Sequence, residues 1–211
     1  MTTDPIAHPI LNCLNLRGQA LGNPEGWGWV LDDPVVRCFS PALHLIADQG
    51  LISLTDPVHQ SSKDIYWHNT AYWVRREDTL KPILEAFEGA NIEVVPLKGA
   101  ALVGTLYKKI GLRLMTDIDV LVRPQDFVQA AELVLAGGLK PKWSFESGNL
   151  FEFTRMPPEF WPGELSFYDG QRFHFDLHRD LVPSHWFKVP HPVSMDEVWE
   201  RRINVGDQVE P

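Results

Sequence analysis

The segment RLMTDIDVLVRP, residues 113–124, places two carboxylates inside an otherwise apolar run. Its central part, from about Thr116 to Val122, has the composition of a β-strand, and Arg123-Pro124 ends it. Side chains two positions apart in a strand point to the same face, so Asp117 and Asp119 share one face of a sheet. Two carboxylates this close repel each other, and burial adds to the cost. The strand therefore needs either full hydration at an exposed edge or a divalent cation that takes oxygens from both acids.

A second strand-like segment carries a third carboxylate. Residues 173–178 read F-H-F-D-L-H, a strict alternation of apolar and polar positions. The polar face of this strand would carry His174, Asp176 and His178. Beside Asp117 and Asp119, Asp176 would complete a two-metal site. Two alternatives stay open: a zinc site built from the two histidines and Asp176, and a hydrated outer face without a ligand.

The third feature is the stretch P-L-K-G-A-A-L, residues 96–102. A strand end followed by Lys-Gly and a helix start presents backbone N–H groups and a cation to an anion. Gly99 would permit close approach of the backbone, and Lys98 would meet phosphate charge. The spacing is not that of a P-loop, and an ordinary turn is the alternative.

The element order predicts an α+β (mixed α/β) domain, with a mixed β-sheet flanked by helices and a mainly helical N-terminal region. Residues 1–90 would form the N-terminal loop and helical region, and residues 91–211 the core domain. Helices are expected over 35–52, 63–89 with a break at Pro82, 98–107, 124–138 and 196–202. Strands are expected over 92–97, 116–122 and 139–147, and as a hairpin of 165–168 with 172–178 around Asp169-Gly170.

Composition limits the class of protein. The 211 residues carry a formal net charge of −9, which argues against a long nucleic-acid partner. No apolar run approaches the roughly 20 residues that span a bilayer, and the first residues do not resemble a signal peptide. Cys13 and Cys38 are the only cysteines, and reduced thiols are favoured over a disulfide. A cytoplasmic protein without membrane attachment is expected.

Together, the three features resemble the nucleotidyltransferase superfamily typified by DNA polymerase beta. The line VVPLKGAALVGTLYKKIGLRLMTDIDVLVRPQDFVQAAELVLAGG is similar, more narrowly, to a family of uncharacterised bacterial nucleotidyltransferases. The hallmark of that family is L-K-G, then R-x-x-x-D-I-D-x-L-V, then a helix, and the similarity runs from about Val94 to His178. The resemblance implies transfer of a nucleoside monophosphate from an NTP to a small-molecule or protein acceptor, with Mg²⁺ or Mn²⁺ as cofactor.

The resemblance also implies residue roles. Asp117 and Asp119 match the metal-binding pair, and Asp176 matches the third carboxylate, so all three are the expected catalytic and metal-binding residues. Lys98 and Gly99 stand where the superfamily usually has a Gly-Ser pair that grips the triphosphate, and this departure leaves the grip on phosphate open.

Arg113 matches an arginine of the family, which would face phosphate or form a salt bridge with an acid. His178 would orient Asp176 or act as a structural hydrogen-bonding group. The aromatic-rich segment 143–161 would line a pocket or belong to the core. Family members usually continue with helices, and one hypothesis is that this chain lacks a C-terminal helical part.

Two other functions are left open by these features. One is a non-catalytic member of the same fold that binds a nucleotide or a protein, which the missing Gly-Ser pair would explain. The other is a zinc-dependent hydrolase built on His174, Asp176 and His178, which leaves the D-x-D strand unexplained.

Overall fold

The computed structural model describes residues 40–103, 107, 109–113, 115–143, 148–171, 173–181 and 194–202. Residues 1–39 of the predicted N-terminal region, with both cysteines, lie outside this part of the chain. The chain divides into two compact units, Met1–Arg75 with Leu106–Leu114, and Arg76–Thr105 with Met115–Pro211. The division at residue 90 drawn from the sequence stays a prediction.

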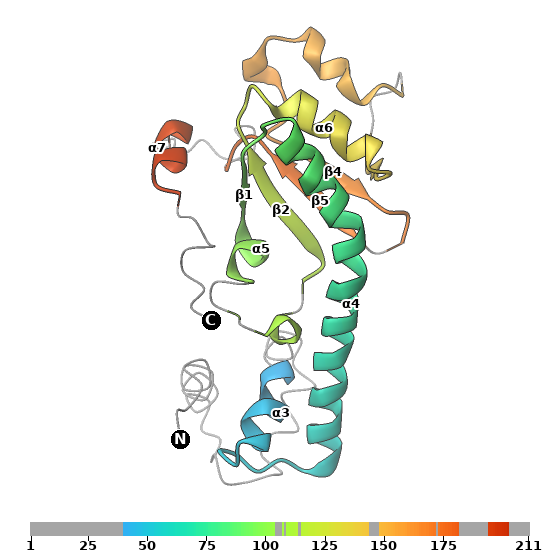
Figure 1. Ribbon diagram of the computed structural model, residues 1–211, viewed down its shortest axis with the longest axis vertical. Helices are drawn as coiled ribbons and strands as arrows, with labels where there is room; N and C mark the ends of the chain where they lie inside the picture. Colours follow the sequence, from blue (N-terminus) through green and yellow to red (C-terminus); the bar gives the residue numbers. More distant parts are fainter. Residues whose placement is uncertain are drawn as a thin grey trace. The chain divides into compact units, whose positions relative to one another are not determined.

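The described elements combine helices with one mixed sheet, which confirms the predicted fold class (Figure 1). The α-helices are α3 (Ser40–Asp48), α4 (Asp56–Gly89), α5 (Lys98–Leu102), α6 (Phe127–Ala136) and α7 (Met195–Glu200). The strands are β1 (Val94–Pro96), β2 (Asp117–Val122), β3 (Lys140–Pro141), β4 (Glu164–Tyr168) and β5 (His174–His178). Short 3₁₀ helices cover Ile110–Leu112, Leu150–Arg155 and Pro158–Phe160. None of the helices in the described residues is long and apolar enough to cross a membrane.

The first unit is a small helical core. Buried apolar side chains of α3, the segment after it, the start of α4 and the 3₁₀ helix Ile110–Leu112 pack together. The 3₁₀ helix lies close against α4, because the carbonyl of Gly111 accepts a hydrogen bond of 3.1 Å from Asn69 Nδ2. A Cβ atom at residue 111 would overlap Thr70 Oγ1 and the backbone oxygen of Tyr66, so glycine is required at this contact.

Helix α4 is longer and more continuous than the sequence predicts. It begins at Asp56 rather than near residue 63, and Pro82 does not split it. A proline inside a helix removes one backbone donor and crowds the preceding turn. Here Pro82 is exposed, while Ile83 and Phe87 are fully buried on the other side of the helix. Burial of this apolar face offsets the local cost of the proline.

The sheet of the second unit has the order β1-β2-β5-β4-β3. Strands β2 and β5 run parallel, and the other neighbouring pairs run antiparallel. The β4–β5 hairpin turns at Asp169-Gly170, as the sequence predicts. Gly170 has φ +84°, and Asp169 Oδ1 accepts backbone hydrogen bonds from Gln171 (2.7 Å) and Phe173 (3.1 Å). This turn sets the register of β4 on β5.

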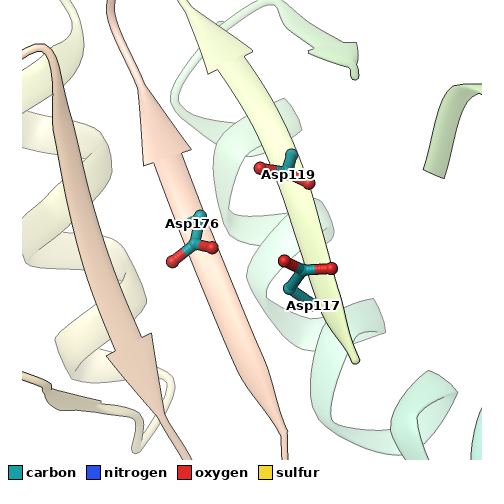
Figure 2. A group of neighbouring side chains, drawn as sticks. All are labelled: Asp117, Asp119 and Asp176. Atoms are coloured by element: carbon teal, nitrogen blue, oxygen red, sulfur yellow. The ribbon is translucent and has the colours of Figure 1, made fainter. Parts of the chain in front are cut away.

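The two faces of the sheet differ in chemistry. On β2, β4 and β5 one face is apolar and buried: Ile118, Val120, Val122, Leu165, Phe167, Phe175 and Leu177. Figure 2 views the opposite face, with helix ribbons passing behind the strands. Helix α6 packs against β5. The apolar alternation of the strands therefore directs every second side chain into the core and the polar ones to the other face.

Two local predictions are changed by the structure, and one open alternative is decided in part. The helix expected over 98–107 ends as α5 at Leu102, and β3 has only two residues. The aromatic segment contributes to the core, since Phe153 is fully buried and packs edge-on against Trp161 at 5.4 Å between ring centroids. Phe145 lies outside the described residues, and Phe160 is 67% exposed.

Candidate metal centre

Three carboxylates meet on the polar face of the sheet. Asp117 and Asp119 lie along β2 and Asp176 lies beside them on β5, as Figure 2 shows. Asp119 and Asp176 are register partners on the parallel strands, so their side chains project from the same face. One oxygen from each of the three carboxylates lies within 4.8 Å of the others. The structure thus brings together the three acids that the sequence selects, and metal binding by them stays a prediction.

Asp119 is the most strongly compensated of these acids. It is buried, and its Oδ1 accepts hydrogen bonds from Lys98 Nζ at 2.5 Å and His178 Nε2 at 2.9 Å. Burial acts to raise the pKa of Asp119, but the hydrogen bonds and charges of His178 and Lys98 hold the pKa below its ordinary value. Asp119 is therefore ionised at neutral pH and already shares its charge with two nitrogen atoms.

Asp176 has the opposite electrostatic environment. Burial raises its pKa above the ordinary value, and the negative charges of Glu164, Asp119 and Asp117 add to this rise. A hydrogen bond from Ser166 acts in the other direction without outweighing them. This side of the cluster therefore carries excess negative charge.

Lys98 begins α5 in an uncommon backbone conformation. Its φ is +48°, a region that side chains other than glycine rarely adopt, and the following Gly99 is buried. The turn is fastened to β2 by a 2.9 Å hydrogen bond from the backbone N–H of Leu97 to the carbonyl of Asp119. Burial acts to lower the pKa of Lys98, but the pairing with Asp119 raises it above its ordinary value. Lys98 thus lies at the carboxylate cluster, although the sequence predicts only its contact with phosphate.

His178 contacts a different carboxylate from the one expected. Its Nε2 is hydrogen-bonded to Asp119 on the neighbouring strand, and not to Asp176 on its own strand. Its Nδ1 lies 3.6 Å from Glu164 Oε2, and Ser166 Oγ donates to Glu164 Oε1 at 3.0 Å. From the sequence alone, Glu164 and Ser166 are not identified as residues of this site. The signal for them is the alternation E-L-S-F-Y, which the predicted hairpin would set opposite the polar face of β5.

The zinc arrangement of His174, Asp176 and His178 does not form. Within the described part of the chain, the His, Cys, Asp and Glu side chains close enough to share one ion are Asp117, Asp119 and Asp176. Both ring nitrogens of His178 face carboxylates instead. Side chains four positions apart in a strand share a face but lie about 13 Å apart along it, which separates His174 from His178 too widely for one small ion.

Two arginines have separate positions. Arg113 belongs to the first unit, where its guanidinium lies over the ring of Tyr107 at 5.9 Å. Its contact with phosphate or with an acid stays a prediction. Arg76, which is not singled out in the sequence, lies over Phe173 at 5.1 Å and donates weakly to the carbonyl of Met115 at 3.5 Å. Burial lowers the pKa of Arg76 to about 10, against the opposing charges of Asp169 and Asp117.

The donor set fits a divalent cation. Carboxylate oxygens are the ligands that Mg²⁺ and Mn²⁺ prefer, and the three oxygens are close enough to coordinate shared ions. The pKa of Asp176 is raised first by burial and further by the negative charges of Glu164, Asp119 and Asp117. A bound cation would offset these charges, with Asp117, Asp119 and Asp176 as its ligands.

Comparison with known protein families gives a match over most of the chain. A family model described as an uncharacterised nucleotidyltransferase matches residues 42–209. No curated protein and no solved structure matches the chain. The matched range includes the three carboxylates, the Lys98-Gly99 turn and the β4–β5 hairpin.

Proposed function

The chain belongs to the family of uncharacterised nucleotidyltransferases, and we propose that it moves a nucleoside monophosphate from an NTP to a small-molecule or protein acceptor with the help of Mg²⁺ or Mn²⁺. The observation that carries this proposal is the convergence of Asp117, Asp119 and Asp176 on one face of the sheet, within 4.8 Å of one another. The net charge of −9 disfavours a long nucleic acid as the acceptor.

Each group has a role in this reaction. Divalent metal, when bound, supplies charge neutralisation for the triphosphate and lowers the pKa of an acceptor hydroxyl. Asp117, Asp119 and Asp176 would bind this cation through their carboxylate oxygens. The acceptor hydroxyl gives up its proton to water and its oxygen attacks the α-phosphorus. The bond from that phosphorus to the bridging oxygen breaks, and pyrophosphate leaves with the electron pair of that bond.

Lys98 supports the proposal as a cation that can exchange partners. Its ammonium group is bound to Asp119, while its side chain is 62% exposed. A cation that takes the oxygens of Asp119 would leave Lys98 available to phosphate oxygens of the NTP. In this way a lysine would supply charge where the superfamily usually has the Gly-Ser pair.

The proposal is tested by incubating the chain with each NTP and Mg²⁺ or Mn²⁺. Pyrophosphate release and transfer of α-phosphate label to added acceptors, or to the chain itself, are measured. Label transfer that needs metal and disappears in Asp117→Ala is the expected result. Asp78→Ala, which removes an exposed acid of α4, is the matched control and should behave as wild type.

A second candidate function is a non-catalytic module of the same fold that binds a nucleotide or a protein. The replacement of Gly-Ser by Lys98-Gly99 favours it. Thermal unfolding with NTP distinguishes the two functions. Stabilisation by NTP that ignores both the metal and Asp117→Ala, without pyrophosphate release, would support the binding module and contradict the transferase.

A further inference from the structure

Glu164 lies next to both sides of the carboxylate cluster. It opens β4 and is the register partner of His178 on β5, while Ser166 is the register partner of Asp176. Asp176 is in turn the register partner of Asp119 on β2. Register partners project from the same face of a sheet, so Glu164 shares the face of the three aspartates that Figure 2 shows. Glu164 on β4 thus contacts His178, a partner of Asp119, and Ser166, a partner of Asp176.

On one side, Glu164 contacts the ring that holds Asp119. Its Oε2 lies 3.6 Å from His178 Nδ1, and His178 Nε2 lies 2.9 Å from Asp119 Oδ1. The histidine is buried, with a side chain only 7% exposed, so few orientations are open to its ring. A group fixed at Nδ1 therefore fixes the atom that touches the carboxylate, as outer partners of metal ligands do.

On the other side, Glu164 contacts the hydroxyl that reaches Asp176. Ser166 Oγ lies 3.0 Å from Glu164 Oε1 and donates to it, and Ser166 is also a hydrogen-bond partner of Asp176. A serine hydroxyl has one hydrogen, so it donates to one of the two acids at a time. The position of Glu164 therefore influences the hydrogen bonding of Asp176 as well.

A fourth acid at this place is costly unless it has a role. Its charge adds to the repulsion that Asp176 experiences, and its side chain is only 36% exposed. We propose that Glu164 is a positioning residue, which holds Asp119 through the ring of His178 and competes with Asp176 for the hydrogen of the Ser166 hydroxyl. This inference rests on the proposed function, because it takes the aspartates to be metal ligands.

Mn²⁺ binding to the full chain, measured by calorimetry, tests the role of Glu164. The variants are Glu164→Ala, Glu164→Asp and Glu164→Gln, with Glu159→Gln as the control at an exposed acid of the same unit. Glutamine keeps the reach and an oxygen for Ser166 but loses the charge, whereas aspartate keeps the charge but loses the reach. Removal of an outer partner typically costs about 10–100-fold in metal affinity.

The expected result is a loss of about 10–100-fold in Mn²⁺ affinity for Glu164→Ala and Glu164→Asp, with Glu164→Gln and the control close to wild type. The reverse order, with Glu164→Asp intact and Glu164→Gln weakened, would show a charge acting through space and overturn the inference. Wild-type affinity in Glu164→Ala would overturn it too. A wild-type chain that binds no Mn²⁺ overturns this inference together with the proposed function. Mn²⁺ binding with the expected order but no NTP turnover contradicts the proposed transfer alone.

Discussion

Asp119 and Asp176 are register partners on neighbouring parallel strands, yet their surroundings are opposite in charge. Asp119 is held by Lys98 and His178, and its pKa lies below the ordinary value. Asp176 has acids as its charged neighbours, and its pKa lies above the ordinary value. The strand backbone brings the two acids close together. Side chains from the turn at Lys98 and from β5 then decide which acid is neutralised. A cation bound by these acids, as we propose, would gain most on the side of Asp176.

The largest expected effect is on activity, where substitution of either acid should have the same consequence despite their different surroundings. Asp119→Asn and Asp176→Asn should each lower the rate of pyrophosphate release by about 10²–10³-fold or more, since both would lose stabilisation of transition-state charge. Release is measured with NTP and saturating Mn²⁺, and Asp78→Asn is the control. Activity retained in one variant would show that this aspartate is not needed for transfer.

Protein stability without metal should separate the same two variants. Asp119→Asn should lower the free energy of unfolding by about 1–3 kcal/mol, because the buried His178 loses a charged partner. Asp176→Asn should raise it or leave it unchanged, because an acid repelled by its neighbours becomes neutral. Denaturant unfolding in EDTA at pH 7 measures both. Equal destabilisation by the two substitutions would contradict the difference in charge compensation.

The shared face of Asp117 and Asp119 follows from sequence, because the period of two in a strand decides which of its side chains point the same way. The hairpin is also predictable, since Asp169 and Gly170 are suited to the turn that they form. The pairing of β2 with β5 is implied only by family resemblance, as nothing local in either segment selects its neighbour. The alternation of each strand thus predicts its polar face but not the strand beside it.

The remaining contacts depend on tertiary structure. The left-handed backbone of Lys98 and its bond to Asp119 join residues on separate elements, so the lysine-glycine pair alone predicts only an anion contact or a turn. Glu164 becomes visible only when the register of β4 on β5 is known. Pro82 is misleading because local propensity predicts a break, whereas burial of Ile83 and Phe87 keeps the helix continuous.

The pH dependence of stability should sharpen the comparison. The folded-state pKa of Asp176 is raised from 3.8, so the folded chain binds more protons than the unfolded chain between these two values. Its contribution to stability is present below pH 3.8 and is lost as the pH rises through the folded-state pKa. The stability of Asp176→Asn relative to wild type should therefore increase over this range, by at most about 1.4 kcal/mol per pH unit. Unfolding in EDTA as a function of pH measures this, and a constant difference would contradict it.

The smallest expected effect concerns Lys98, the side chain that pairs with Asp119. Because Lys98 is 62% exposed, its ion pair with Asp119 contributes little, about 0.2–1 kcal/mol. Lys98→Met should therefore tighten Mn²⁺ binding in the absence of NTP by up to about fivefold, since the metal no longer competes with an ammonium group. Binding of NTP should become weaker in the same variant, because a phosphate partner is lost. Lys81→Met, which removes an exposed lysine of α4, is the control. The opposite signs are the decisive feature: a lysine that only stabilised the fold would weaken both kinds of binding, and one that only bound phosphate would leave Mn²⁺ binding unchanged.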